Sequence, residues 1–421
     1  MQNISYFCIV KRFKHIFKAT WLAFLLSLTT SGVARAQTED ISYEEIDSVR
    51  ISLLTCGPGR LSYELYGHTA IRIEGYPFTF YNKKGEAFTF NDVAVNWGLF
   101  SFKQPHFILR FIFGRTDYRM GISPMEMFLE EYEEEGRWVY QQKLNLLPRE
   151  KRLIIDAVKK NDLPENRFYR YDYLYDNCTT RADKMITDHL NGSRAAFDID
   201  GFNGFALTYR DCIHYYNSED RWARLGNDLL LGLKADRHIT HEQSLFLPIN
   251  LMNSYEHWGI SEGDSIRMIV SEESQLLCET EETSQVSLPS PMACATFLML
   301  FTLVITIAEC IRRKIVWLFD AILLSLAGLC GIILFAMIFS EHPTVQANLQ
   351  ILLLNPLALL CLYHTVRHRQ TGKRHWLWQA YAICILLFFL GNFLQHYAEG
   401  MNVLALCLLI RCYVNIKIWH E

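Results

Sequence analysis

The part of the chain between residues 37 and 290 contains little cysteine. It has no Cys-x-x-Cys pair, and its cysteines are Cys56, Cys178, Cys212 and Cys278. Such few and scattered cysteines exclude a small domain held together by disulfides. A zinc-protease motif is also missing, because His238 and His241 in HITHE do not match the spacing or order of His-Glu-x-x-His. We therefore predict neither a metal site nor a cofactor.

The chain also lacks an excess of basic residues. Its 41 Lys and Arg face 45 Asp and Glu, which gives a net charge of −4. A protein that binds nucleic acid usually carries a basic surface, so nucleic acid is not a predicted partner.

Residues 1–36 have the pattern of an export signal. A basic region from Lys11 to Lys18 precedes the short apolar run WLAFLLSLTTSGV, and Ala34-Arg35-Ala36 fits the small-residue cleavage pattern. We predict a mature chain that starts near Gln37. The alternative is an uncleaved membrane anchor, since the basic region is long.

Long apolar runs begin after residue 291. Each is close to the ~20 residues that cross a bilayer, and we predict five transmembrane helices at 292–311, 315–340, 346–366, 376–394 and 398–418. The loops 312–314 and 367–375 are basic, whereas 341–346 and 395–400 contain no Lys or Arg. The positive-inside rule places the basic loops in the cytoplasm. We therefore predict a multi-pass protein of the bacterial inner membrane, with residues 37–290 periplasmic and a cytoplasmic C-terminus.

The composition divides the mature chain into three parts. Residues 37–270 are predicted to form the exported domain, and residues 292–421 the membrane domain. Between them, 271–291 is acidic and rich in Ser and Thr without an apolar period, so it is interpreted as a solvated linker. Helical additions to the exported domain are expected around 123–160 and 195–245.

The stretch YDYLYDNCTTRADKMI places one cysteine at the predicted start of a helix. Asn177 or Asp176 is the candidate N-cap, and the apolar face is formed by Ala182, Met185, Ile186 and Leu190. In the first turn, the partial positive charge of the helix favours the thiolate of Cys178, and free N–H groups can bind an oxyanion. Cys178 is therefore a candidate nucleophile. The alternatives are a small buried apolar residue, or a structural disulfide with Cys56.

A general base is predicted on a strand upstream of this helix. RISLLTCG is typical of a buried strand, and the sequence after Gly67 alternates so that His68 lies on its polar face. Gly67 allows another backbone or side chain to come close. The alternative is that His68 is an ordinary surface or core residue.

An aromatic segment, LFSFKQPHFILRFIFGR (99–115), is interspersed with Lys103, Arg110 and Arg115. One interpretation is a surface that docks on anionic lipid headgroups near the active site. The other is a core helix whose basic ends reach solvent.

Several motifs together resemble a known family. They are TCGPG (55–59), YGHTAIRI (66–73), VNWGLFSF (95–102), LPENRFYRYDYLYDNCTTR (163–181) and the five terminal spans. They resemble the Lnb family, lipoprotein N-acyltransferases with an exported thiol domain. The order of His before Cys is also similar to lecithin:retinol acyltransferase-like enzymes, which are permuted relatives of NlpC-type and papain-like proteins.

We expect an α+β fold with two parts. The resemblance implies a permuted papain-like, NlpC-like exported domain, in which an antiparallel sheet packs on the helix that carries the cysteine. An all-α bundle of five transmembrane helices is expected to follow it.

The resemblance also implies the chemistry. Cys178 would take an acyl chain from a membrane phospholipid as a thioester, with His68 as general base and then acid. The acyl chain would pass to the α-amine of the N-terminal, diacylglyceryl-modified cysteine of a lipoprotein.

Supporting residues are expected around this pair. Asn96 matches the family pattern best as the residue that orients His68, with Asp92 and Glu74 as alternatives. Asn177 and Tyr175 are expected to shape the oxyanion site.

Two other functions remain open. One is a membrane-anchored cysteine hydrolase, a cell-wall amidase or peptidase, although such an enzyme would not need five spans. The other is a non-enzymatic membrane assembly protein in which Cys178 is structural.

Overall fold

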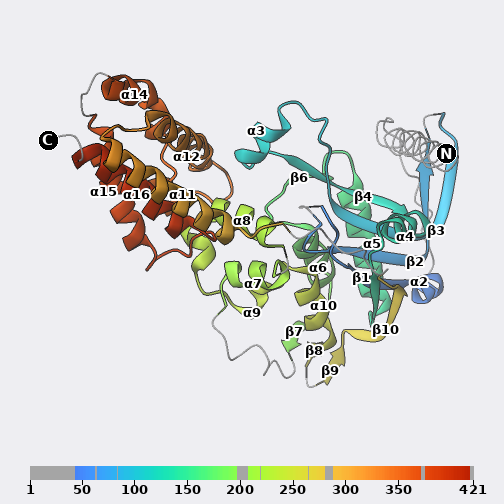
Figure 1. Ribbon diagram of the computed structural model, residues 1–421. Helices are drawn as coiled ribbons and strands as arrows, with labels where there is room; N and C mark the ends of the chain where they lie inside the picture. The colour runs from blue at the N-terminus through green and yellow to red at the C-terminus, as the bar shows by residue number, and fades with distance from the viewer. Residues whose placement is uncertain are drawn as a thin grey trace, which may run out of the picture.

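The computed structural model describes residues 43–61, 64–82, 84–196, 207–218, 220–263, 265–279, 288–370 and 375–417. The predicted export signal lies outside the described residues. An α+β domain is followed by a helical domain, and the two meet near helix α8 (Arg221–Leu230) (Figure 1).

The first domain is built on an antiparallel sheet of seven strands in the order β10-β5-β1-β2-β3-β4-β6. The strands are β1 (Arg50–Cys56), β2 (His68–Tyr81), β3 (Ala87–Leu99), β4 (Asp117–Pro124), β5 (Val139–Leu144), β6 (Phe168–Arg170) and β10 (Val270–Leu277). A second sheet of three strands contains β7 (Ser193–Ala196), β8 (Trp258–Glu262) and β9 (Ser265–Met268).

Helices cover both faces of the large sheet, because its central strands are apolar on both sides. Three helices pack on the face that carries Ile71 and Val95, namely α5 (Pro148–Asp162), α6 (Cys178–Thr187) and α10 (Pro248–Glu256). Helix α4 (Met125–Glu135) covers the other face, where Ala70 and Ala94 lie. A strand points alternate residues to opposite faces, so each face collects its own cluster. The predicted antiparallel sheet packed on the cysteine helix is thus present.

The helical addition predicted around 123–160 is present as α4 and α5, although residues 139–144 between them form β5, which pairs with both β1 and β10. The predicted linker is wrong in part. Residues 271–277, expected to be a solvated linker, belong to β10, so the exported domain extends to Leu277. The acidic side chains of β10 are tolerated because it is an edge strand with partners on one side only.

The remaining elements of the first domain lie at its periphery. They are α2 (Tyr43–Ser48), α3 (Phe107–Ile112), α7 (Tyr209–Tyr216), α8, η1 (Leu233–Asp236) and α9 (His241–Ser244). Helix α3 contains no buried residue, so the interpretation of the segment 99–115 as a core helix is wrong.

The second domain contains α11 (Pro291–Arg312), α12 (Trp317–Met337), η2 (Leu349–Leu352), α13 (Leu357–Leu360), α14 (Leu362–Gln370), α15 (Leu377–Gly391) and α16 (Met401–Lys417). Among the described residues, α11 and α12 are long and apolar enough to cross a membrane. A third span is added if Leu349–Leu360 and Leu362–His368 are counted together across their bend of 69°. The third predicted span is thus broken, and the count of five stays a prediction.

A buried ion cluster joins three of these helices. Arg411 of α16 is fully buried and binds Glu309 of α11 and Asp320 of α12, each with a closest contact of 2.6 Å. Asn415 donates a further hydrogen bond to Asp320, at 2.8 Å. Charges in an apolar environment are tolerated only when they are paired, so the cluster fixes how α11, α12 and α16 pack.

The two domains are held together by backbone hydrogen bonds. The N–H groups of Gly232 and Leu233 donate to the carbonyl oxygens of Thr344 and Ala347, both at 2.8 Å. Gln395 adds a side-chain hydrogen bond to the Leu231 carbonyl at 3.0 Å. The exported domain therefore contacts the membrane domain at the α12–η2 connection, and these contacts form the junction between the two domains.

Gly232 provides a test of this junction. A Cβ at Gly232 would collide with the Ala347 carbonyl, whereas a Cβ at Gly226 of α8 meets nothing within 4 Å. We expect Gly232→Ala to destabilise the protein by about 1–3 kcal/mol through overpacking. Gly226→Ala should stabilise it by about 0.5–1 kcal/mol through helix propensity. Thermal unfolding of the detergent-purified full chain measures both, and equal melting temperatures would contradict a tight junction.

Candidate active site

Helix α6 begins at Cys178, as predicted, and Asn177 is its N-cap. The Oδ1 atom of Asn177 accepts the Thr180 N–H at 2.9 Å, and the Thr180 hydroxyl accepts the Asn177 N–H at 2.8 Å. The Asn177 amide group also donates to the carbonyls of Tyr173 and Phe246, both at 2.9 Å. Because these donors are occupied, Asn177 supports the helix start rather than offering a donor to a substrate.

Strand β2 begins at His68, and the residue before it requires glycine. Gly67 has a φ of +79°, and a Cβ there would collide with the carbonyl oxygen of Cys56. The predicted close approach at Gly67 is therefore confirmed. This turn brings the start of β2 beside the start of α6, where the hydroxyls of Thr69 and Thr179 lie 3.0 Å apart.

The site combines Cys178, His68 and Asn96. The Nε2–H of His68 donates to Oδ1 of Asn96 at 3.1 Å. His68 is also close enough to Cys178 for each group to shift the pKa of the other through its charge and hydrogen bonding. Asn96 lies on β3 opposite Ala70, and His68 is two residues before Ala70, so the two side chains share a sheet face. Cys178 is 9 % exposed and Asn96 8 % exposed.

The two alternatives to Asn96 lie elsewhere. Asp92 forms an ion pair with Arg72 at 2.7 Å, and Glu74 pairs with Arg50. Since both carboxylates are engaged by arginines, neither is placed to orient His68.

The electrostatics of the pair favour charge separation. Burial by itself raises the pKa of Cys178, but the charge of His68, its hydrogen bond, and the N–H of Thr69 together lower that pKa from 9.0 to about 7. Burial lowers the pKa of His68, but the Cys178 charge and hydrogen bonds to Cys178 and Asn96 raise it overall. A low thiol pKa beside a raised imidazole pKa is the signature of a thiolate–imidazolium pair.

Tyr175 lies away from this pair. Its side chain is 46 % exposed and contacts the ring of Tyr209, with centroids 5.6 Å apart. These contacts do not link Tyr175 to the oxyanion site, so its expected role there stays a prediction.

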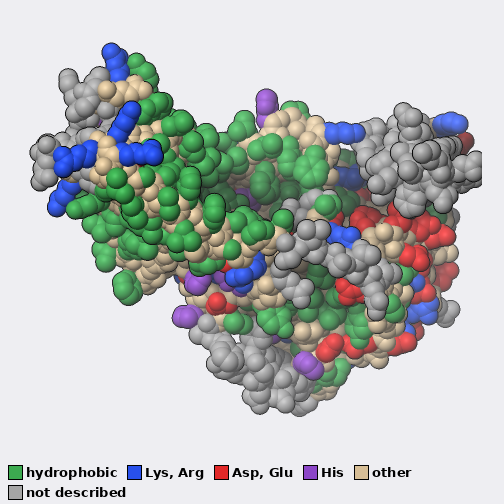
Figure 2. Space-filling view, in the orientation of Figure 1, with side chains coloured by type: hydrophobic (Ala, Val, Ile, Leu, Met, Phe, Trp, Pro, Cys, Tyr) green, Lys and Arg blue, Asp and Glu red, His purple; other side chains and the backbone are tan. Residues whose placement is uncertain are grey.

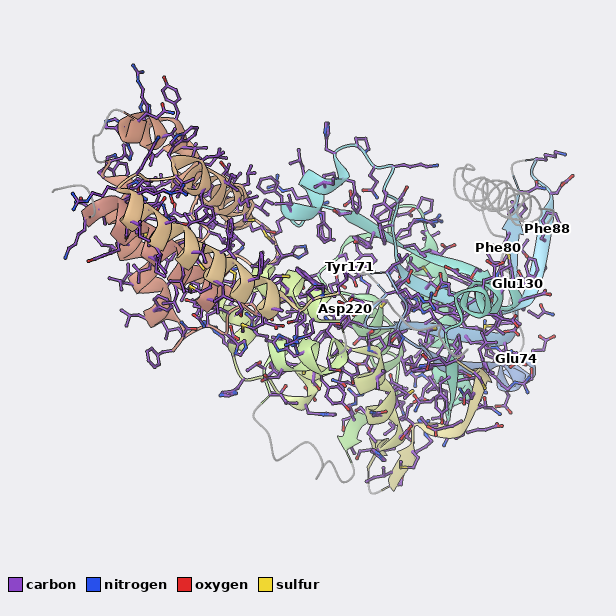
Figure 3. All side chains as sticks on the ribbon, viewed as in Figure 1. Glu74, Phe80, Phe88, Glu130, Tyr171 and Asp220 are labelled. Atoms are coloured by element: carbon purple, nitrogen blue, oxygen red, sulfur yellow. The ribbon has the colours of Figure 1, made fainter. Side chains whose placement is uncertain are left out.

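Two other tyrosines belong to the same core cluster as Cys178, and sequence reasoning did not select them. Burial, followed by the charge of Cys178, raises the pKa of both Tyr169 and Tyr171. A Cβ added to Gly98 would lie 3.7 Å from the Tyr171 ring and 3.8 Å from Cβ of Cys178. In YRYDYLY every second residue is a tyrosine, and a strand points every second residue to one face. This spacing could have indicated that several of these tyrosines share a face. Tyr171 is labelled near the centre of the molecule in Figure 3.

The loop before Cys178 is held by the membrane domain. His342 Nδ1 lies 3.2 Å from Asp172, and the hydroxyls of Tyr173 and Thr344 lie 3.1 Å apart. Burial raises the pKa of Asp172, but the hydrogen bond from His342 and backbone N–H groups lower it overall. The segment that presents the cysteine is therefore fixed from the α12–η2 connection.

The other buried thiols of this domain differ from Cys178. Cys56 and Cys212 are free, and burial raises their pKa to about 12 and about 11. Cys178 is also a free thiol, and it lies in a different apolar cluster from Cys56, so the predicted alternative of a disulfide between them is wrong. Among the described residues, no group of three or more His, Cys, Asp and Glu could hold a metal ion.

The ion pair predicts how Cys178 reacts with iodoacetamide. We expect the alkylation rate of Cys178, followed by peptide mass spectrometry, to rise with pH around a midpoint near 7, because its pKa is lowered to about 7. In His68→Ala the midpoint should move to higher pH, since the Thr69 N–H then remains to oppose the effect of burial but the charge and hydrogen bond of His68 are gone. His257→Ala, at an exposed histidine, is the matched control and should keep the wild-type midpoint. The same midpoint in His68→Ala and wild type would rule out the pair.

Comparison with known families covers both domains. The model of the Lnb N-terminal periplasmic domain matches residues 41–200, and that of the Lnb transmembrane domain matches residues 281–421. No curated protein and no solved structure matches the chain. The two family matches lie in the order predicted from the motifs, and the first contains Cys178, His68 and Asn96. The chain therefore belongs to the Lnb family, and it is a membrane protein with a periplasmic domain.

Proposed function

We propose that the protein is a lipoprotein N-acyltransferase that uses Cys178 as its nucleophile. The observation that carries this proposal is the buried thiol of lowered pKa, hydrogen-bonded to His68 and located beside the junction with the membrane domain. A nucleophile near a bilayer is suited to a lipid ester, and the family match supports the same substrate class.

In the first half-reaction, the Cys178 thiolate attacks an ester carbonyl of a phospholipid. The carbon–sulfur bond forms, the carbon–oxygen bond of the ester breaks, and the imidazolium of His68 gives its proton to the leaving glycerol oxygen. A lysophospholipid departs, and the acyl chain remains on Cys178 as a thioester. His68 is now neutral.

In the second half-reaction, the α-amine of a diacylglyceryl-modified lipoprotein attacks the thioester. Neutral His68 takes the proton of the attacking nitrogen, an amide bond forms, and the carbon–sulfur bond breaks. The products are an N-acylated lipoprotein and the restored thiolate–imidazolium pair. No cofactor is needed, because protons and electrons balance over the two steps.

The start of α6 supports both half-reactions. N–H groups at the start of a helix lack intrahelical partners, and with the Thr180 N–H bound to Asn177, those of Cys178 and Thr179 are the candidates here. They are suited to bind the negative oxygen of each tetrahedral intermediate. We further propose that the hydroxyls of Tyr169 and Tyr171 contribute to this polar environment, since both tyrosines lie in the core cluster of Cys178 and its charge raises their pKa.

The proposed membrane topology has five spans and a cytoplasmic C-terminus. Figure 2 shows Lys and Arg side chains at the end of the helical bundle that points away from the exported domain. This arrangement supports a cytoplasmic location for the basic loops around Arg313 and Arg367. A permuted papain-like fold is proposed for the exported domain, supported by the order of His68 on a strand and Cys178 at a helix start.

Hydrolysis is the second candidate, because the same thiol and imidazole could direct a water molecule at the thioester. Its only support is the shared chemistry, whereas the contacts with the membrane domain favour a lipid substrate. Non-enzymatic assembly has less support, because a structural role does not require a cysteine of lowered pKa.

Replacement of the nucleophile tests the proposal directly. Cys178→Ala should abolish N-acylation and remove a fatty-acyl mass increment that hydroxylamine releases, while the protein still inserts. Intact mass spectrometry of the membrane-extracted protein measures the adduct. Cys278→Ala, at an exposed cysteine, is the control and should retain both. Full N-acylation by Cys178→Ala would disprove the assignment.

Asn96 is proposed as a positioning residue. A hydrogen bond to a charged group contributes about 1.5–3 kcal/mol, so Asn96→Ala should slow acylation of Cys178 roughly 10- to 150-fold. Asn96→Asp should instead raise the pKa of His68 and extend activity to higher pH, because a carboxylate stabilises the imidazolium. Asp92→Asn, which alters the pair with Arg72, is the control and should change neither rate nor pH profile. An unshifted pH profile in Asn96→Asp would contradict contact with His68.

A further inference from the structure

We propose that helix α3 inserts into the outer leaflet of the membrane. We further propose that the aromatic side chains between α3 and Cys178, from Phe111 to Tyr171, form a wall that guides a phospholipid to the cysteine. For the lipid's role as acyl donor the inference rests on the proposed function. The contact with the bilayer rests on α3 alone.

Helix α3 exposes large apolar side chains. Ile108 is 72 % exposed, Leu109 55 % and Phe111 49 %, and Phe102 just before the helix is 63 % exposed. Several large apolar side chains exposed next to one another are typical of an interaction site. Figure 2 shows hydrophobic side chains continuing from the helical bundle onto the region of α3.

The position of α3 identifies its partner as lipid. The Glu341 N–H donates to the Phe113 carbonyl at 3.0 Å, and Arg115 binds the Glu341 carboxylate at 3.0 Å. Glu341 lies only four residues beyond the end of α12, so α3 lies level with the end of a helix that is long and apolar enough to cross a membrane. That end of α12 also exposes Phe335 and Phe339. The apolar surface of α3 therefore continues the exposed apolar surface of a candidate span, and lipid is the partner that suits both.

An unbroken set of aromatic rings leads inward from α3. The ring centroids of Phe107 and Phe111 are 6.2 Å apart, and Phe100 contacts Phe107 at 5.8 Å. Phe100 contacts Tyr118 at 5.0 Å, and Tyr118 stacks on Tyr171 at 4.3 Å. Tyr171 lies beside Gly98 and Cys178. The wall thus runs from exposed Phe111 to the nucleophile, and its apolar faces suit an acyl chain.

Charge plays a minor part in this surface. Arg110 pairs with Asp117, and Arg115 pairs with Glu341, so both guanidinium groups are engaged within the protein. Insertion should therefore depend on apolar contact rather than on anionic headgroups, and vesicles of zwitterionic phosphatidylcholine should suffice.

Photo-crosslinking tests the contact without relying on activity. The full chain carries p-benzoylphenylalanine at Phe111, at Phe107 or at Phe88, and is reconstituted in phosphatidylcholine vesicles. Phe88 is the matched control because it is 48 % exposed but lies at the far end of the exported domain (Figure 3). We expect lipid adducts by mass spectrometry at positions 111 and 107, and none above background at 88. Absence of lipid at 111, equal adducts at 111 and 88, or a protein dimer at 111 would overturn the proposal.

A kinetic comparison separates this proposal from the proposed function. Phe111→Glu should slow acylation of Cys178 by vesicle lipid roughly tenfold, because an inserted Phe side chain contributes about this factor in partitioning. It should slow acylation by a monomeric short-chain phospholipid less than acylation by vesicle lipid, because a monomer does not depend on insertion of α3, and Phe88→Glu should affect neither. Equal acylation of Phe111→Glu and wild type by vesicles would contradict the lipid path. A wild-type protein that forms no acyl adduct would instead count against the proposed function, and the crosslinks would still decide the position of α3.

Discussion

The hydrogen-bonded pair of Cys178 and His68 is the interaction on which the rest of the site depends, because each group by itself would be neutral in these surroundings. Burial disfavours the thiolate and the imidazolium separately, as it does for Cys56 and Cys212, whose thiol pKa values are raised. Mutual attraction, with help from the Thr69 N–H and from Asn96, reverses this effect, lowering the pKa of Cys178 and raising that of His68. The fold must therefore hold two side chains from distant parts of the chain in hydrogen-bond contact.

Several local structures combine to hold that contact. Gly67 permits the turn before His68, the cap formed by Asn177 and Thr180 fixes the start of α6, and Asn96 on the neighbouring strand sets the orientation of the ring. Each of these elements is anchored in the sheet or in a core cluster, so little entropy is lost when the site engages a substrate.

The membrane domain contributes to the same arrangement. Its α12–η2 connection binds the loop at Asp172 and Tyr173, receives backbone hydrogen bonds from Gly232 and Leu233, and contacts the end of α3 through Glu341. The domain is therefore more than an anchor, because it sets the position of the cysteine loop relative to the membrane. This coupling gives a physical reason for the two domains to occur in one chain.

The sequence by itself determined the features that depend on local pattern. Period-two alternation located the strand after Gly67, and helical spacing with an Asn cap located the start of α6, because neighbouring residues decide both. Motifs identified the family and selected Asn96 as the partner of His68. By contrast, only the tertiary structure showed that Asp92 and Glu74 are held by arginines, and that Tyr169 and Tyr171 belong to the core cluster of Cys178, because the packing of the whole domain decides these contacts. The acidic segment 271–277 resembled a linker for the same reason: its place as an edge strand depends on pairing with β5, more than a hundred residues earlier. The exposure of α3 was likewise decided by tertiary structure, since an apolar helix has the same sequence pattern whether it packs in a core or lies against lipid.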